Sequence, residues 1–596
     1  MAKVWSFNTT IRNPERMENM LRALTDLEGL EFDEHGQEVF FGLQIKKRLY
    51  KPTKKTLRDS DLISAVYDDS SGDDIDDVIV ERILAKYRRS SVNGSGRGRT
   101  AAGILNRFGL CVAKKSKGSV VITELAKKWL QHEIDDEELF TKFFIKWQYP
   151  NKIESGYEGF NIKPFIATLA LIKSVNKKWE VLGNKPVGLS NQEYQLFVTS
   201  LTKPSQIEEY AEKIINYRSE KESKTGKDKT DYIKEFEIRR AKEIFGNAKI
   251  KKSLSNLRDY MDSSKRYFRT SGLIAFRGAD NYVDISKEKE VEVNSILDSI
   301  SASSLKFESY ETYFNYLSNM ESVHFPWQND DDLIKINEQL SNVIKLEAEE
   351  LNIDNYLPAI DGLSINKKKD TLEKSLNEIR ILKLRGVKHD ISVLDECIKK
   401  LSSITDKNYE NTTARPSLDL EWYVSRALMV LNDAIKIDPS FNIGDDGIPT
   451  GFRPNVSDIE CYYESFNMTV EPTLLCRRDQ WIAEGQPVMR HLRDFENKTE
   501  HNVVYCLFIA PSIHRDTLNT FWGSNKYGYE GKIQKIIPFT IIQFIEILKI
   551  AKNKISENNL SHQSINNLFE SISGSVSDFE ISQEWMDSFP NLINEW

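Results

Sequence analysis

The sequence predicts a multidomain α+β protein whose C-terminal part is an α/β domain. Its 596 residues, 40% of them hydrophobic, suffice for three to four folded domains. Residues 459–470 alternate as a β-hairpin does, and residues 503–509 form a continuous apolar run typical of a strand covered on both faces. Residues 301–405 are polar, poor in Gly and Pro, and apolar at helical spacing, which predicts a helical linker domain.

Composition narrows the class of protein. The net charge of −8 excludes a uniformly basic coat but allows local basic patches. The five cysteines contain no CxxC pair, which indicates reduced thiols and no structural zinc site. The sequence shows no signal peptide and no apolar run of membrane-spanning length, so we expect a cytoplasmic protein without a membrane partner.

Two carboxylates bracket the expected hairpin. Asp458 would start its first strand, Glu471 would end its second, and Glu464-Ser465 lies near its turn. Because antiparallel strands of similar length return the chain beside its start, both carboxylates can meet at one end of the hairpin.

The segment after the hairpin adds two more polar groups. A helix is expected over residues 479–495, with Glu484 and His491 two turns apart on one face if it is continuous. Gly485 and Pro487 make a break between them an alternative.

Clustered carboxylates at a strand end suit a hard divalent cation. Mg²⁺ takes one or two carboxylates together with water and substrate phosphate, so Asp458, Glu471 and Glu484 are candidate metal ligands. The alternative is that they are solvated hairpin ends of an acidic protein. His491 would orient a phosphate or help to activate water; a packed, hydrogen-bonded histidine is the competing interpretation.

Residues 88–130 predict a helix–hairpin–helix unit in the order of a winged helix. A Gly/Ser-rich basic loop precedes a helix over 100–108 that Gly109 caps, and two short strands enclose a basic turn. The alternative is a small α/β module with ordinary surface lysines. If the unit binds DNA, the contacts would come from Arg97, Arg99, Asn106, Arg107, Lys114, Lys115 and Lys117.

Residues 251–289 repeat the pattern. A helix with apolar residues at helical spacing leads into the hairpin pattern GLIAFRG…YVDIS, which parallels GLCVAKKSKGSVVIT in the first unit. Two tandem winged-helix-like modules are therefore expected. Phosphate or guanine contacts would come from Lys265, Arg266, Arg269 and Arg277.

Several motifs together resemble a known family. They are Ser457-Asp458, Glu471-Pro472-Thr473, Glu484, the run Pro487–His491, Leu420-Glu421-Trp422, the KWQYP segment at 146–150 and the RYFR segment at 266–269. The sequence is similar to the AlwI/PleI/MlyI/BstNBI group of type IIS restriction and nicking endonucleases, within the PD-(D/E)xK nuclease superfamily. Ser457 replaces the group's proline. Thr473, which the group shares, stands where most of the superfamily has lysine.

The resemblance implies a function and a domain order. It implies a type IIS-like DNA endonuclease that uses Mg²⁺, with Mn²⁺ able to substitute, and cuts a few base pairs outside a short asymmetric site. Glu421 would join the catalytic cluster, with a surface helix position as the alternative. A DNA-binding regulator with a degenerate nuclease fold is the other function considered. The domains would be recognition regions at 1–245 and 246–300, the linker at 301–405 and the nuclease at 406–596.

Partners are implied as well. Double-stranded DNA is the expected substrate, and a cognate DNA methyltransferase would belong to the same system. Cutting both strands would need a transient homodimer through the nuclease domain or a small nuclease subunit, because one acidic cluster attacks one strand.

Overall fold

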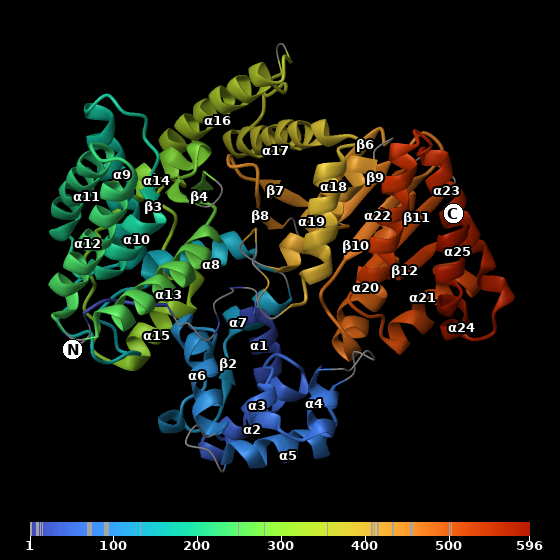
Figure 1. The fold of residues 1–596 in the computed structure, drawn as a ribbon, viewed down its shortest axis with the longest axis horizontal. Coiled ribbons are helices and arrows are strands. Elements are labelled where there is room, and N and C mark those ends of the chain that lie inside the picture. Colours follow the sequence, from blue (N-terminus) through green and yellow to red (C-terminus); the bar gives the residue numbers. More distant parts are fainter. Residues whose placement is uncertain are drawn as a thin grey trace. The chain divides into compact units, whose positions relative to one another are not determined.

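The structure is a computed structural model whose chain divides into two compact units. Unit 1 comprises Met1–Leu43, Ser90–Ile379 and Ile443–Gly451, and unit 2 comprises Gln44–Arg89, Arg380–Asn442 and Phe452–Trp596. The residues described are 3–7, 11, 14, 16–67, 74–88, 94–131, 133–247, 249–278, 281–353, 356–406, 409, 412–413, 416–431, 434–452, 457–499, 501 and 503–596. Most elements of both units are labelled in Figure 1.

Unit 1 is mainly helical, with short antiparallel strands. Helices α2 and α17 and the β7–β8 hairpin cross its boundaries with unit 2. Its elements are α1 (Arg16–Thr25), α2 (Glu34–Lys46), α6 (Gly94–Arg107), β1 (Cys111–Val112), β2 (Val121–Ile122), α7 (Glu124–Leu130), α8 (Asp136–Lys146), α9 (Pro164–Val181), β3 (Leu189–Ser190), α10 (Asn191–Phe197), α11 (Gln206–Glu222), α12 (Gly226–Phe245), α13 (Ile250–Arg269), β4 (Ile274–Arg277), β5 (Tyr282–Ile285), α14 (Glu290–Ser299), α15 (Tyr310–Ser318), α16 (Asp330–Glu350), α17 (Ile365–Leu384), β7 (Phe441–Ile443) and β8 (Pro449–Phe452).

The first expected helix–hairpin–helix unit has the predicted order but not the predicted start. Helix α6 begins at Gly94, so the described part of the expected basic loop is helical; residues 89–93 lie outside the described residues. Gly98 explains the glycine-rich sequence, because a Cβ there would lie 1.9 Å from the carbonyl oxygen of Gln37. Gly98 thus permits close packing of the helix against Gln37. Gly109 ends the helix with a positive φ of 71°, as predicted.

The two expected recognition modules share one core. Phe108 of the first stacks on Phe143 at 3.7 Å between ring centroids, and Phe7 stacks on Tyr267 of the second at 4.7 Å. Both modules fall in unit 1. In the second module the strands have the order β3-β5-β4, so the predicted 274–285 hairpin gains a third strand.

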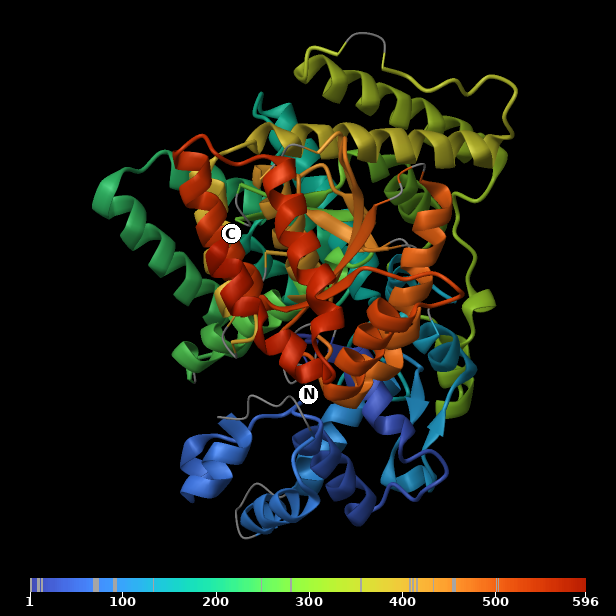
Figure 2. The same ribbon diagram turned by 90° about the vertical axis from the view of Figure 1, so that its right-hand side faces the viewer.

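The predicted linker region is helical throughout its main elements. Helices α16 and α17 pack through a shared apolar core that includes Ile336, Leu340, Leu372 and Leu376, and they lie side by side in both views (Figure 1, Figure 2). The residues of this region up to Ile379 belong to unit 1, and the later ones belong to unit 2.

Unit 2 is an α/β domain built on a mixed sheet. The five strands have the order β12-β11-β10-β9-β6, in which β10, β11 and β12 are parallel and β9 is antiparallel to both its neighbours. Its elements are α3 (Lys54–Leu57), α4 (Ser60–Tyr67), α5 (Asp77–Arg88), α18 (Ile391–Ser403), α19 (Pro416–Leu431), β6 (Lys436–Pro439), β9 (Ile459–Tyr462), β10 (Asn467–Pro472), α20 (Arg477–Lys498), β11 (Val504–Ala510), α21 (Arg515–Tyr527), β12 (Ile536–Thr540), α22 (Ile541–Ser556), α23 (His562–Gly574), α24 (Ser582–Asp587) and α25 (Phe589–Glu595).

Helices cover both faces of this sheet, as the apolar run of β11 predicted. Phe508 points to the face where Val488 and Leu492 of α20 pack, whereas Tyr505 contacts Phe569 of α23 on the other face. Every residue of β11 is buried. Helix α20 runs unbroken through Pro487, which settles the open question of a break after Gly485.

No helix among the residues described is long and apolar enough to cross a membrane. The thiols of Cys461 and Cys506 are free and buried in strands, as predicted.

Candidate active site

Asp458 and Glu471 face each other across two strands. The β9–β10 register pairs Ile459 with Val470, so its continuation by one residue sets Asp458 opposite Glu471. Parallel pairing sets Glu471 beside Phe508, which points toward α20. Both carboxylates therefore lie on the sheet face that α20 covers, at the end of the hairpin where the sequence predicted them.

Helix α20 carries the other two polar groups to this face. Val488 and Leu492 anchor the helix on the sheet, and Glu484 lies one turn before Val488 on the same side. The Nδ1 atom of His491 is 3.2 Å from Oε1 of Glu471. The continuous helix α20 thus carries both Glu484 and His491 along the sheet face where β10 ends.

Burial and mutual repulsion perturb the charges of these groups. Burial raises the pKa of Asp458 well above its usual value, and the neighbouring Glu471 and Glu484 raise it further. Burial also raises the pKa of Glu471, with Glu484 adding to the effect and hydrogen bonds from Ser457 and the Asp458 backbone opposing it. Carboxylates that repel one another in a partly desolvated site are stabilised by a bound cation.

The residues present fit a hard divalent ion that shares its coordination with substrate. Among the described residues, no three His, Cys, Asp or Glu side chains form a complete metal cage. Mg²⁺ does not require one, since it is commonly held by one or two carboxylates plus waters and phosphate oxygens. Asp458 and Glu471, which lie opposite each other and repel, supply that partial set.

The sequence did not point to Gln480, which shapes the site. Gln480 is fully buried; its Nε2 donates to the carbonyls of Leu475 and Ser512, both at 2.9 Å, which fixes the turn after β10. An isolated glutamine in a polar helix start gives no signal of this role.

Glu421 is 4% exposed on α19, which packs against β10, so its alternative as a surface residue is wrong. The Thr473 hydroxyl accepts a hydrogen bond from Leu475 N.

The predicted DNA contacts of the first module differ in accessibility. Arg99, Lys115 and Lys117 are exposed, and Arg97 and Lys114 are partly buried. Arg107 is paired with Glu154 at 2.5 Å. Asn106 requires a correction: it is 1% exposed, and its amide bonds to the backbone of Ala102 and Ala113, so it fastens the hairpin to α6 and is not available to DNA.

The second module needs a similar correction. Arg269 is 1% exposed and forms a bidentate pair with Asp446, and Lys265 is buried with Nζ 3.2 Å from Asn191 Oδ1. Neither side chain is accessible. Arg266 and Arg277 keep about a fifth of their side-chain surface exposed, at 20% and 21%.

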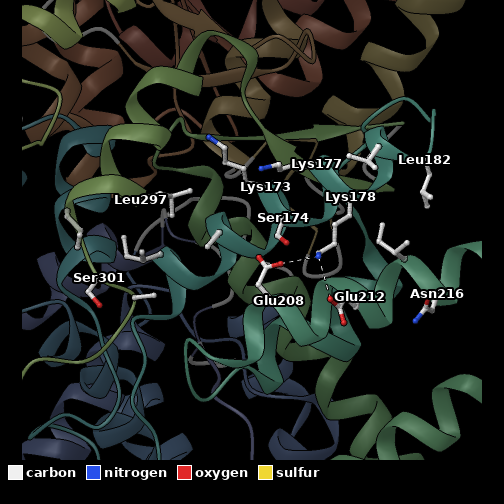
Figure 3. A pocket seen from close by; sticks show the side chains of 16 residues that line it. Lys173, Ser174, Lys177, Lys178, Leu182, Glu208, Glu212, Asn216, Leu297 and Ser301 are labelled. Carbon is white, nitrogen blue, oxygen red and sulfur yellow. Dashed lines mark ion pairs between the residues drawn. The ribbon is translucent and has the colours of Figure 1, made fainter.

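A groove of unit 1 lies apart from all of these residues. It measures about 980 Å³ between α9, α11 and α14, and Lys178 spans it to Glu208 and Glu212 (Figure 3). Apolar side chains such as Ile166 and Leu297 line much of it. It contains none of the predicted catalytic or DNA-contacting residues.

Comparisons with known proteins agree with the motifs. The family model of the AlwI restriction endonuclease matches residues 106–547. No curated protein matches the sequence. Among solved structures, the small subunit (R.BspD6I2) of the heterodimeric restriction endonuclease R.BspD6I is 21% identical over 34% of this chain and 98% of its own, with a TM-score of 0.28.

Two further solved structures are similar at the same low level. The BpuJ1 endonuclease binding domain, in complex with modified DNA, is 16% identical over 45% of this chain and 95% of its own, with a TM-score of 0.27. Restriction endonuclease FokI is 12% identical over 96% of this chain and 99% of its own, with a TM-score of 0.24.

The family match defines the chain as a DNA endonuclease. Because the family match spans most of its length, the chain belongs to the AlwI restriction endonuclease family. It is a type IIS-like DNA endonuclease.

Proposed function

We propose that the chain hydrolyses a phosphodiester with Mg²⁺ a few base pairs outside a short asymmetric recognition site. The observation that carries the proposal is the pairing of Asp458 with Glu471 at the end of the β9–β10 hairpin, on the face that α20 covers with Glu484 and His491. Asp458 and Glu471 would hold the ion and Glu484 would support it. Mn²⁺ would substitute, because it accepts the same oxygen ligands.

The protein's own groups prepare the site for a negatively charged substrate. A bound divalent ion lowers the pKa of a coordinated water and neutralises charge on the scissile phosphate. His491 fixes the orientation of Glu471, since a neutral imidazole with its proton on Nδ1 donates to Oε1 of that carboxylate. Its Nε2 atom then has a lone pair with which to orient or accept a proton from water.

The proposed function also assigns roles to the two units and implies partners. Unit 2 from β6 onward would be a PD-(D/E)xK-like nuclease core, and the two helix–hairpin modules of unit 1 would be winged-helix-like DNA-recognition elements, joined by the helical linker. Cutting of the second strand would need a second copy of the nuclease domain or a separate small subunit. A DNA methyltransferase would protect the host's own sites, and the protein would act in the cytoplasm.

Cleavage of plasmid DNA in Mg²⁺, followed by run-off sequencing of the products, tests this function. Breaks at a fixed distance from one asymmetric sequence, lost with EDTA and restored by Mn²⁺, are the expected result. Specific binding without cleavage in either metal would instead identify a DNA-binding regulator with a degenerate nuclease fold.

A further inference from the structure

The turn between β7 and β8 supplies two acidic residues to the second helix–hairpin module. In sequence this turn lies between two strands of the nuclease sheet, β6 and β9, yet residues 443–451 belong to unit 1. Asp446 pairs with Arg269, and Asp445 pairs with Arg277 through an Nη2–Oδ2 contact of 2.8 Å. These arginines are two of the four cations of the second module that the sequence assigned to DNA contact.

Both carboxylate oxygens of Asp446 are used in hydrogen bonds within the fold. Its two carboxylate oxygens accept bonds from both terminal nitrogens of Arg269, at 2.6 and 3.1 Å, and from the backbone nitrogens of Phe276 and Ile448. Both side chains of the ion pair are almost completely buried, at 1% and 4% exposed. A buried, bidentate pair whose carboxylate oxygens also accept from the backbone is an integral part of the fold.

Asp445 is held differently, although it is the neighbouring residue. Its Oδ2 accepts from Arg277 and from the backbone nitrogen of Lys287, whereas its Oδ1 is buried without a hydrogen-bond partner among the described residues. Burial and the nearby carboxylate of Glu288 both raise its pKa. The Asp445 side chain is 1% exposed, so one of its two carboxylate oxygens is buried without a hydrogen bond while the other binds the guanidinium of Arg277.

Arg277 can exchange this partner. It is 21% exposed, and Asp284 and the carbonyl of Ile285 hold its Nε and Nη2 atoms in place independently of Asp445. A guanidinium that is anchored on one side, and bonded on the other to a carboxylate with one unsatisfied oxygen, is oriented for a competing oxyanion. A DNA phosphate presents such an oxyanion, and a guanidinium is a strong hydrogen-bonding partner for it.

We propose that Asp445 is an internal substitute for a DNA phosphate, which occupies Arg277 in the free protein and which DNA must displace. The proposal rests on the proposed function, because it requires Arg277 to contact DNA. Its consequence is weaker non-specific binding: each encounter with arbitrary duplex must first break the Arg277–Asp445 pair. Asp445 is thereby a specificity-determining residue that suppresses unproductive association.

Binding of a labelled short duplex of random sequence to the full-length protein in EDTA tests the proposal. Asp445→Asn removes the competing charge and keeps the side-chain shape, so it should bind about two- to fivefold more tightly, the effect of losing one partly exposed ion pair. The log–log salt dependence should steepen by roughly 0.5–0.9, because one more cation faces the phosphates. Asp445→Glu, which keeps the charge, should bind as the wild type does.

A double-mutant cycle shows whether the effect passes through Arg277. Arg277→Ala should weaken binding, and Asp445→Asn should have no further effect in that background. Asp395→Asn is the matched control, since it removes one carboxylate from an exposed pair with Lys552 elsewhere in the chain. Thermal unfolding confirms that each variant is folded, and Asp445→Ser replaces Asp445→Asn if the latter does not fold.

The outcomes separate this proposal from the function on which it rests. Unchanged or weaker binding by Asp445→Asn, while Arg277→Ala binds less well, overturns the role of Asp445 alone. Tightening that persists in the Arg277→Ala background, or that Asp395→Asn reproduces, shows a general charge effect and also overturns it. Binding by Arg277→Ala equal to that of the wild type refutes the DNA contact itself.

Discussion

The Nδ1 atom of His491 lies 3.2 Å from Oε1 of Glu471, which joins helix α20 to the end of strand β10. The contact spans 20 residues of sequence and fixes a carboxylate that has only 4% of its surface exposed. A histidine that orients a metal-binding carboxylate acts through that carboxylate, and such supporting partners contribute to both metal affinity and rate.

His491→Ala should therefore impair cleavage by lowering metal affinity. We expect about 10–100-fold less activity at limiting Mg²⁺, with partial recovery at high Mg²⁺. His491→Asn, whose amide can still donate to Glu471, should retain more activity at limiting Mg²⁺ than His491→Ala. The measurement is the single-turnover cleavage rate against Mg²⁺ concentration. Equal losses at every Mg²⁺ concentration would show that His491 acts on the reaction and not on the carboxylate.

Removing either facing carboxylate should abolish cleavage without abolishing DNA binding. Asp458→Ala and Glu471→Ala each delete a proposed metal ligand, and Glu484→Ala should lose most activity. Binding to cognate duplex in Ca²⁺ or EDTA should stay within a few-fold of wild type. Glu460→Ala on the same strand is the control, because Glu460 bonds to the Tyr462 hydroxyl and flanks Asp458 without belonging to the proposed ligand set. Full cleavage by Asp458→Ala or Glu471→Ala would refute the metal site.

The β9–β10 hairpin was predictable because its sequence signals are local. Alternation over 459–470 gives the strands, and antiparallel return of the chain then sets Asp458 opposite Glu471, as the structure has them. The contact of His491 with Glu471 required one further condition, an unbroken α20, which the sequence left open because Gly485 and Pro487 both permit a break.

The errors in the recognition modules have a different origin. A basic residue in sequence does not reveal whether its partner is water, phosphate or a distant carboxylate. Arg269 meets Asp446 across 177 residues, so no local pattern could show that it is buried. The helical start of α6 was missed for a related reason, since Gly98 is explained only by the backbone of Gln37, which it contacts in the fold.

The Arg269–Asp446 pair changes what a recognition fragment can be. The sequence suggested that a fragment ending near residue 300 would bind DNA without cutting it. Such a fragment lacks Asp446 and leaves Arg269 buried and unpaired, which costs about 3–5 kcal/mol. We therefore expect it to be unstable, and the full-length Asp446→Ala variant to be destabilised by a similar amount in urea unfolding. Wild-type stability of Asp446→Ala would show that the pair does not hold the fold together.

A buried lysine should make stability depend on pH. Lys146 is 1% exposed and donates to the carbonyls of Leu317 and Asn319; burial, with a contribution from Lys142, lowers its pKa to about 7. Between that value and the usual 10.5, the folded chain binds fewer protons than the unfolded chain, so the free energy of unfolding should rise with pH.

Lys146→Met should flatten this rise. The comparison is the slope of stability between neutral and alkaline pH, because the variant also loses two hydrogen bonds and its absolute stability changes at every pH. Urea unfolding at a series of pH values gives both slopes. Identical slopes for the two proteins would assign the pH dependence to other groups.

The number of strands cut per binding event follows from the number of carboxylate clusters. The proposed site of Asp458, Glu471 and Glu484 is a single site in one orientation. Because the strands of a duplex run antiparallel, a second cut would need a second nuclease domain related by approximate two-fold symmetry. At low protein concentration, supercoiled plasmid should first accumulate as open circle with every nick on one strand relative to the site. If two copies associate through the nuclease domain, conversion to linear DNA should rise more steeply than linearly with enzyme; if a separate subunit is required, linear product should be absent.

Gel analysis of plasmid forms across an enzyme dilution series, with sequencing of the nicked strand, gives both readouts. Immediate linear product with first-order enzyme dependence at high dilution would show that one chain cuts both strands, and a single catalytic cluster could not account for it.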